Sequence, residues 1–222
     1  MSKDIAVVIL NYNGKRFLER FLDNVVRYSP EAEVVVADNA SKDGSVDYLQ
    51  SRHPEVTILV NEKNFGYAGG YNQALEKLHH KYYVLLNSDI EVTDGWLSAM
   101  HHFMEANPDV AACQPKLLSY ADMAYFEYAG AGGGFIDKFG YPFCRGRLFQ
   151  TIEADEGQYN DIQEVFWASG ACMFVRREAF WAAGGFDADF FAHMEEIDLC
   201  WRMKHKGWKV MYVPQSKVYH IG

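Results

Sequence analysis

The chain has 222 residues, of which 49% are hydrophobic and 23% are charged, and its formal net charge is −9. This composition is typical of a folded globular domain, and the acidic balance argues against nucleic acid as a partner, because phosphate backbones bind basic surfaces. The four cysteines form no CxxC pair, and the longest apolar runs are too short for a signal peptide or a membrane span, so zinc-ribbon, disulfide-framework and membrane-spanning classes are not indicated.

The first half of the chain alternates between strand and helix patterns. Continuous apolar runs predict strands that are buried on both faces at residues 5–10, 34–37, 56–60 and 83–86. Apolar residues at helical spacing predict helices over 17–26, 66–78 and 96–103, and a short strand is expected at 110–113. Strands and helices that alternate at this spacing predict βαβ units and a parallel sheet.

The second half is less regular. Residues 114–164 lose the alternation, and a long irregular segment of this kind usually forms a functional loop or lid. A strand is expected over 165–175, a helix over 195–206 and a last strand over 210–213. The sequence stops at Gly222 without an element that caps this strand, which is consistent with a fragment of a longer protein.

Four polar clusters follow the predicted strands of the first half, at residues 11–14, 38–41, 61–66 and 87–89. In an open parallel sheet the ligand binds outside the carboxyl ends of the strands. One such cluster could arise by chance, whereas four in succession indicate a site at this edge of the sheet.

Asp89 is the most informative single residue, because it ends the polar tripeptide Asn87-Ser88-Asp89 directly after a buried strand. Mg²⁺ and similar hard cations bind one or two protein carboxylates together with phosphate oxygens and water. The stretch therefore suits a metal beside a nucleotide. An ordinary turn is the alternative, since Asn, Ser and Asp all favour turns.

Asp38 stands in the corresponding place after the second strand, where an acid can accept hydrogen bonds from a nucleobase or a ribose. Asp43 and Ser45, close behind it, are better suited to cap the next helix.

Residues 64–72 open a helix with three glycines, which lets the backbone approach a phosphate but also serves close packing. No GxGxxG fingerprint follows the first strand.

Residues 193–202 place three acids within four positions. In a helix, Glu195, Asp198 and Arg202 share one face, and Asp198 can pair with Arg202, while Glu196 points elsewhere. A carboxylate there could act as the general base that an acceptor hydroxyl needs. A solvated helix face is the alternative. Near the end of the sequence, His220 is a lone histidine, and such residues are more often structural than ligands.

Together these stretches resemble family 2 glycosyltransferases, the inverting enzymes with the nucleotide-diphospho-sugar transferase (GT-A) fold. The resemblance is carried, in the family's order, by residues 8–13, 36–41, 64–72, 86–89, 169–171, 184–187 and 195–202. It is strongest to rhamnosyltransferase-type enzymes that build bacterial surface polysaccharides. The implied fold is α/β, with a Rossmann-like, mostly parallel sheet flanked by helices. It implies one catalytic domain over 1–222, with a nucleotide-binding half over about 1–113 and an acceptor-side half over about 114–222.

The resemblance also implies roles for single residues. Asp89 would bind the metal, with Asn87 in place of the family's first acid, and His220 would be a second ligand. Glu196 would be the catalytic base where the family has aspartate, and Glu195 is the competing candidate. The implied acceptor-binding residues are Gly170 and Asp198. The implied nucleotide-binding residues are Asn11, Asn13, Asp38, Asn64, Gly69, Asn72 and Ser88.

The partners implied by the resemblance are a UDP- or dTDP-sugar donor, a saccharide or lipid-linked saccharide acceptor, and a divalent cation, Mg²⁺ or Mn²⁺. They imply a cytoplasmic location that is compatible with the inner face of the membrane. Two alternatives stay open, a metal-dependent sugar nucleotidyltransferase and a non-catalytic carbohydrate-binding relative. A nucleotidyltransferase usually carries a glycine-rich, basic phosphate loop after its first strand, whereas this chain has one glycine there, Gly14.

Overall fold

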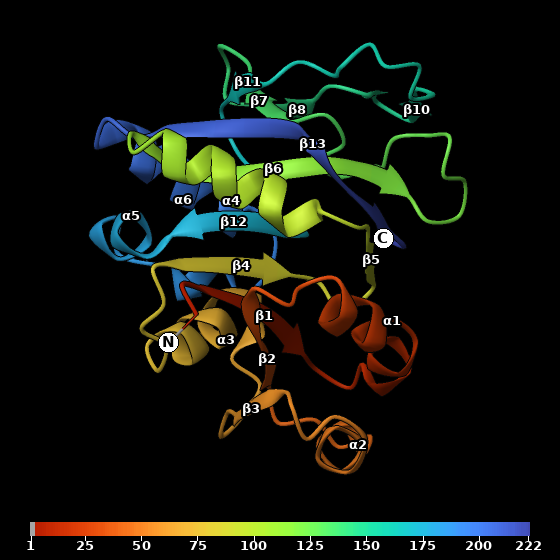
Figure 1. The fold of residues 1–222 in the computed structure, drawn as a ribbon. Helices are drawn as coiled ribbons and strands as arrows, with labels where there is room; N and C mark the ends of the chain where they lie inside the picture. The colour runs from red at the N-terminus through yellow and green to blue at the C-terminus, as the bar shows by residue number, and fades with distance from the viewer. Residues whose placement is uncertain (1–2) are drawn as a thin grey trace.

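In a computed structural model that describes residues 3–222, the chain forms a nine-stranded mixed sheet with helices on both faces (Figure 1). The order across the sheet is β11-β13-β6-β12-β4-β1-β2-β3, and β5 pairs with β13 at one end. The strands of the first half are β1 (Ile5–Asn11), β2 (Ala32–Asp38), β3 (Thr57–Val60), β4 (Tyr82–Leu86) and β5 (Ile90–Val92). Those of the second half are β6 (Val110–Ser119), β11 (Gln163–Val165), β12 (Cys172–Arg176) and β13 (Lys209–His220).

Strand direction sets where the strand ends meet. β1 runs parallel to β2 and β4, β2 runs parallel to β3, and β6 runs parallel to β13. Between these two groups lies β12, which is antiparallel to both β4 and β6, so β6 and β13 point the same way as β1 to β4. The carboxyl ends of all six strands therefore lie at one edge of the sheet, which is the edge where the polar clusters were expected.

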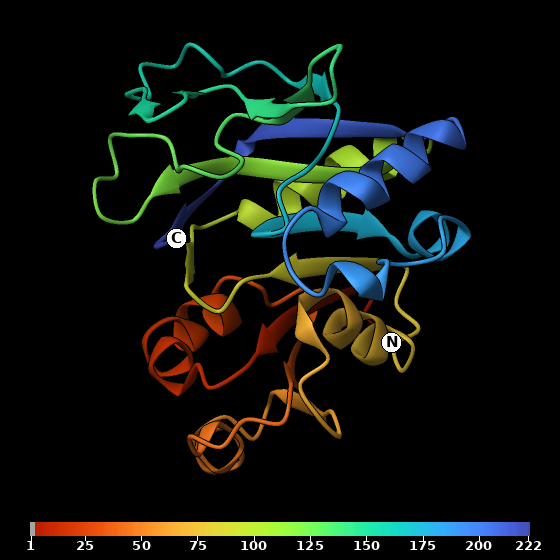
Figure 2. The same cartoon turned by 180° about the vertical axis from the view of Figure 1, so that it is seen from behind.

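The sheet is buried on both faces, which explains the continuous apolar runs. In β1, Ile5, Val7 and Ile9 pack into one core while the alternate residues Ala6 and Val8 pack into the other. The first core lies under α1 (Lys15–Arg27), α2 (Ser45–Arg52) and α4 (Trp96–Ala106). The second lies under α3 (Gly66–Leu75), α5 (Arg177–Ala182) and α6 (Glu195–His205), which Figure 2 shows from behind.

The predicted α/β class and the predicted alternation of elements are confirmed, but the single strand expected over 165–175 was wrong and two predicted strands are longer than expected. Residues 165–175 do not form one strand, because β11 pairs with β13 at the sheet edge and β12 crosses to the centre. The strand expected at 110–113 continues to Ser119, and the one expected at 210–213 continues to His220. Both extensions contain a proline or polar residues, which hid them from an apolar pattern.

The irregular segment contains two short hairpins that lie beyond β13, at the top of Figure 1. In the first, β7 (Gly134–Ile136) pairs with β8 (Pro142–Cys144), and in the second, β9 (Arg147–Leu148) pairs with β10 (Thr151–Ile152). We call residues 134–152 the hairpin lobe. Across residues 3–222, no helix has the length and apolar character that a bilayer span requires.

Arg176 at the end of β12 ties the sheet to α4. It is 9% exposed, and its guanidinium donates hydrogen bonds to the carbonyls of Val110 and Met104 and to the hydroxyl of Tyr82. In Arg176→Ala these two carbonyls and the hydroxyl lose their charged hydrogen-bond donor. We therefore expect the free energy of unfolding to fall by about 2–4 kcal/mol. Chemical denaturation measures this, and Arg52→Ala at an exposed position of α2 is the control, with a change expected to stay within about 0.5 kcal/mol. Equal stability of the two variants would contradict this role of Arg176.

Candidate functional site

The carboxyl ends of β1 and β2 bring two of the polar clusters together. Asn11 and Asp38 are register partners, and Asn11 Nδ2 donates to Asp38 Oδ2 at 2.8 Å. The other oxygen of Asp38 accepts from the backbone N–H of Ser41 at 2.8 Å. Because the side chain of Asp38 is fully buried and both its oxygens are engaged, it orders the two loops rather than standing open to solvent.

Asn13 and Ser41 join these loops at the surface. The hydroxyl of Ser41 accepts from the backbone N–H of Asn13, and the side-chain oxygen of Asn13 accepts from the backbone N–H of Lys42, both at 2.8 Å. Asn13 has a positive φ of 51°, a conformation that Asn adopts more readily than most residues. The sequence pointed to Asn13 as a single residue but to Ser41 only as a member of the polar cluster at 38–41.

The glycine-rich motif starts α3 through a network of asparagines. Asn39 donates to Asn64 at 2.9 Å and to the carbonyl of Gly66 at 2.9 Å, and Asn61 donates to Asn39 at 3.0 Å. A Cβ on Gly69 would lie 3.1 Å from the Cβ of Phe65, so this glycine serves close packing.

Asn72, farther along α3, has both ends of its amide engaged by the backbone of Phe186, at 2.8 and 3.0 Å. Asn64, Gly69 and Asn72 therefore hold the motif together, and Asn72 faces the segment that follows α5 rather than Asp38.

Asp89 and His220, 131 residues apart, meet because β13 pairs with β5. His220 is the register partner of Ile90, and its Nε2 lies 3.1 Å from Asp89 Oδ1. On the other side of the ring, Nδ1 lies 3.3 Å from Glu127 Oε1. Glu127 is buried and comes from the irregular segment, where no motif could have pointed to it.

The charges of this group reinforce one another. Burial alone would lower the pKa of His220, but the carboxylates of Asp89 and Glu127 raise it to about 9. Burial would likewise raise the pKa of Asp89, but the hydrogen bond and the charge of His220 bring it below its ordinary value. Asn87 completes the group, with its amide nitrogen 3.4 Å from His220 Nε2. Ser88 lies on the side of Gly14, where a Cβ on the glycine would be 3.6 Å from its hydroxyl.

A cavity of about 570 Å³ opens beside His220. Its lining includes Glu195 and Glu196 at the start of α6, together with His220 and Glu127. Gly170 also lines it, and a Cβ there would meet the hydroxyl of Tyr67 at 3.1 Å. This hydroxyl donates to the carbonyl of Gly170 at 2.6 Å.

The two glutamates differ in environment. Glu195 is 4% exposed, burial raises its pKa, and its Oε2 has no hydrogen-bond partner. Glu196 reaches the cavity more openly, and burial together with the charge of Glu195 raises its pKa to about 7. Asp198 does not line the cavity, because Arg202 binds its carboxylate at 2.6 and 2.9 Å.

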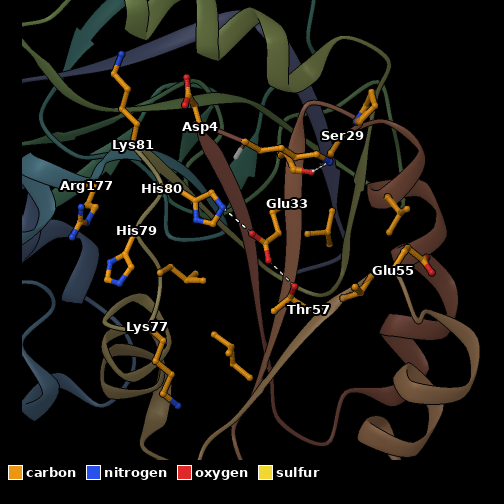
Figure 3. A pocket seen from close by; sticks show the side chains of 18 residues that line it. Asp4, Ser29, Glu33, Glu55, Thr57, Lys77, His79, His80, Lys81 and Arg177 are labelled. Atoms are coloured by element: carbon orange, nitrogen blue, oxygen red, sulfur yellow. Dashed lines mark hydrogen bonds and ion pairs between the residues drawn. The ribbon is translucent and has the colours of Figure 1, made fainter. Parts of the chain in front are cut away.

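A larger cavity of about 1070 Å³ lies at the opposite, amino edge of the sheet (Figure 3). Its interior acid, Glu33, lies 2.9 Å from His80 Nε2 and accepts from the hydroxyl of Thr57 at 2.6 Å. None of the strand-end clusters faces it. Since ligands of such sheets bind at the carboxyl edge, the smaller cavity beside His220 is the candidate site.

Within residues 3–222, no group of three or more His, Cys, Asp or Glu side chains is placed to hold a metal ion by itself. Asp89 and His220 offer one carboxylate oxygen and one imidazole nitrogen that lie 3.1 Å apart. Such a pair fits a cation whose remaining ligands are diphosphate oxygens and water, because Mg²⁺ and its relatives bind in this way at nucleotide sites.

The chain is similar to known proteins over most of its length. The family model described as glycosyl transferase family 2 matches residues 6–184. The chain is 29% identical to an N-acetylglucosaminyl-diphospho-decaprenol L-rhamnosyltransferase of Mycobacterium tuberculosis, over 99% of this chain and 76% of that protein. It is 24% identical to the rhamnosyltransferase WbbL of Escherichia coli, over 97% of this chain and 83% of WbbL.

Two solved structures share the fold. One is GalNAc-T7 with UDP, GalNAc and Mn²⁺, with a TM-score of 0.77 and 18% identity over 99% of this chain. The other is the mannosyltransferase PcManGT of Pyrobaculum calidifontis with GDP-Man and Mn²⁺, with a TM-score of 0.68 and 17% identity over the whole chain. The chain spans 44% and 57% of these two proteins, respectively.

The raised pKa of Glu196 can be measured directly. We expect its carboxyl to titrate near pH 7, so that it is protonated below this pH and charged above it. Glu195→Gln removes the neighbouring negative charge and should lower the pKa of Glu196. Carbon NMR of labelled glutamates measures both values, with Glu196→Gln used to assign the signal. A titration of Glu196 in the ordinary glutamate range would show that the cavity does not desolvate it.

Proposed function

Because the chain belongs to glycosyl transferase family 2, a family of sugar-transferring enzymes, we propose that it moves a sugar from a nucleotide-diphospho-sugar to an acceptor hydroxyl and inverts the anomeric centre. One observation carries the proposal: a single cavity is lined both by Glu196, whose pKa is raised to about 7, and by His220, whose Nε2 contacts Asp89. A base on one side and a diphosphate anchor on the other are what a direct displacement requires.

Glu196 is the proposed base. An acceptor hydroxyl is a weak nucleophile near neutral pH, and a carboxylate in hydrogen-bond reach accepts its proton as the new bond forms. A base works best when its pKa lies near the working pH, and the value of about 7 meets this condition. Glu195 is nearly closed to solvent, and we propose that its role is to raise the pKa of its neighbour.

Asp89 and His220 are the proposed metal ligands. A bound divalent cation would stabilise the negative charge of the departing nucleoside diphosphate. His220 can bind through Nε2 because Glu127 lies against Nδ1 and fixes the orientation of the ring. The Mn²⁺ in two solved proteins of the same fold supports a cation of this class, and Mg²⁺ is the alternative.

The nucleoside of the UDP- or dTDP-sugar donor is proposed to lie along the loops after β1 and β2. The buried carboxylate of Asp38 orders both loops, while Asn13 and Ser41 are placed at their surface. The donor would thus be held mainly by residues of about 1–113, and the acceptor by residues of about 114–222 around Gly170.

The acceptor is proposed to be a saccharide carried on a lipid, in the synthesis of a cell-surface polysaccharide at the inner face of the membrane. The support comes from the relatives, since one is named as acting on N-acetylglucosaminyl-diphospho-decaprenol and both are named as rhamnosyltransferases. A sugar nucleotidyltransferase is not favoured, because the loop after β1 carries Gly14 as its single glycine.

The base is tested by comparing Glu196→Gln with Glu195→Gln in a transfer assay with the UDP- or dTDP-sugar that serves as donor. Glu196→Gln should lower turnover by roughly 10²–10⁴-fold and leave donor affinity nearly unchanged. Glu195→Gln should lower turnover less and move the pH midpoint of the rate below 7, because the pKa of Glu196 falls.

The opposite ranking of the two variants would make Glu195 the base. The product anomer, read by NMR, tests the mechanism independently, since retention of the donor's configuration would contradict direct displacement.

The diphosphate anchor is tested by calorimetry with UDP and with dTDP, each in the presence and absence of Mn²⁺. We expect the Mn²⁺-dependent part of the affinity to disappear in Asp89→Asn, because an amide is a poor ligand for a hard cation. Asp94→Asn, five residues farther on and exposed, is the matched control and should bind as the native protein does. Unchanged Mn²⁺ dependence in Asp89→Asn would remove Asp89 from the site.

A further inference from the structure

The hairpin lobe exposes large apolar side chains at the tips of both its hairpins. Phe139 and Tyr141 lie in the turn between β7 and β8, and Leu148 and Phe149 lie at the turn between β9 and β10. These four side chains are between 68% and 82% exposed, more than any other large hydrophobic side chain of residues 3–222. Hairpin turns normally carry Gly, Asn, Asp or Pro, so four exposed apolar residues in two neighbouring turns call for an explanation.

The conformation of each tip is unusual for apolar residues. The carboxylate of Asp137 accepts from the N–H groups of Phe139 and Tyr141, at 2.8 and 2.9 Å, and so fixes the first turn. In the second turn, Phe149 has a φ of 53°, a left-handed conformation that an aromatic residue rarely adopts. Neither turn gains packing for its apolar residues, so the folding of the chain alone does not account for them.

Basic residues stand beside both tips. Lys138 Nζ lies 4.9 Å from the ring centre of Phe139, and Arg147 directly precedes Leu148. Among residues 3–222, neither has a salt-bridge partner, whereas Arg145 is paired with Asp161. Lys138 is exposed, and Arg147 is half-buried, with its guanidinium donating to the carbonyl of Phe149. Apolar side chains with a basic residue beside each pair complement an anionic surface that has an apolar interior.

The second tip is continuous with the catalytic cavity. Ile152 of β10 lines this cavity and pairs in register with Arg147, and the guanidinium of Arg147 lies 4.0 Å from the ring centre of Tyr128, another lining residue. Whatever the second tip touches therefore lies close to the acceptor side of the site.

We propose that the two hairpin tips dock on the surface of an anionic lipid bilayer, inserting Phe139, Tyr141, Leu148 and Phe149 among the headgroups. Two projecting turns suit a fluid interface, which closes around each of them, better than a protein partner, which must match their shape over a contiguous area. The inference deepens the proposed function, because docking by these turns would hold the mouth of the acceptor cavity at the membrane that carries a lipid-linked acceptor.

Sedimentation of the full chain with vesicles tests this docking without any transfer assay. The native protein should bind vesicles of phosphatidylcholine with phosphatidylglycerol, and bind pure phosphatidylcholine vesicles less. Leu148→Ser combined with Phe149→Asn should weaken the binding by roughly tenfold or more, as should Phe139→Ser combined with Tyr141→Ser. Val60→Ser is the control, because Val60 is also exposed but lies on β3, at the far edge of the sheet, and should leave binding unchanged.

The outcomes separate this inference from the proposed function. All variants should unfold at the temperature of the native protein and should bind UDP or dTDP with Mn²⁺ as it does, because the tips touch neither core nor donor loops. Absent binding of the native protein to anionic vesicles would overturn the docking, and so would equal binding by the tip variants. A dimer in solution that depends on the tips would also overturn it, since a second copy would then cover them. Vesicle binding without sugar transfer would leave the docking intact and contradict the proposed function instead.

Discussion

The pairing of β13 with β5 and β6 decides where the chemistry of this protein lies. It carries His220 from the end of the described chain to Asp89, which follows β4. This pairing depends in turn on β12, whose antiparallel insertion between β4 and β6 leaves the strands on both sides of it pointing the same way. The loops after β1 and β2 and the cavity lined by Glu196 and His220 thus lie at the same edge of the sheet.

The site combines one strongly paired group with one poorly solvated group. Asp89, His220 and Glu127 stabilise one another as alternating charges, so this side of the cavity is ordered before a ligand arrives. Glu195 and Glu196 have no such partners, and burial raises the pKa of both carboxyls. Two neighbouring carboxylates with little solvent around them destabilise the folded state. Raised carboxyl pKa values of this kind cluster at catalytic sites.

The sequence allowed β1 to β4 and helices α1, α3 and α4 to be predicted, because these strands are continuous apolar runs and these helices have apolar residues at helical spacing, whereas the short strand β5, which contains Glu91, was missed. The apolar pattern missed the extensions of β6 and β13, which carry polar or proline residues, and it did not show that residues 165–175 divide between two strands. Contacts between segments far apart in the sequence could not be predicted from the pattern either. The meeting of Asp89 with His220 was suggested by family resemblance alone, and Glu127 had no signal at all. Asn72 carried a motif, but its amide serves the backbone of Phe186.

The central claim is that the donor's diphosphate binds at the carboxyl edge of the sheet, between the loops after β1 and β2 and the pair of Asp89 and His220. A crystal structure of the protein with UDP or dTDP and Mn²⁺ tests it most directly. The account predicts Mn²⁺ bonded to a carboxylate oxygen of Asp89 and to Nε2 of His220, at roughly 2.0–2.2 Å, with the nucleoside along Asn13 and Ser41. A nucleotide bound in the cavity around Glu33 and His80 at the amino edge, or one whose metal touches neither Asp89 nor His220, would contradict it.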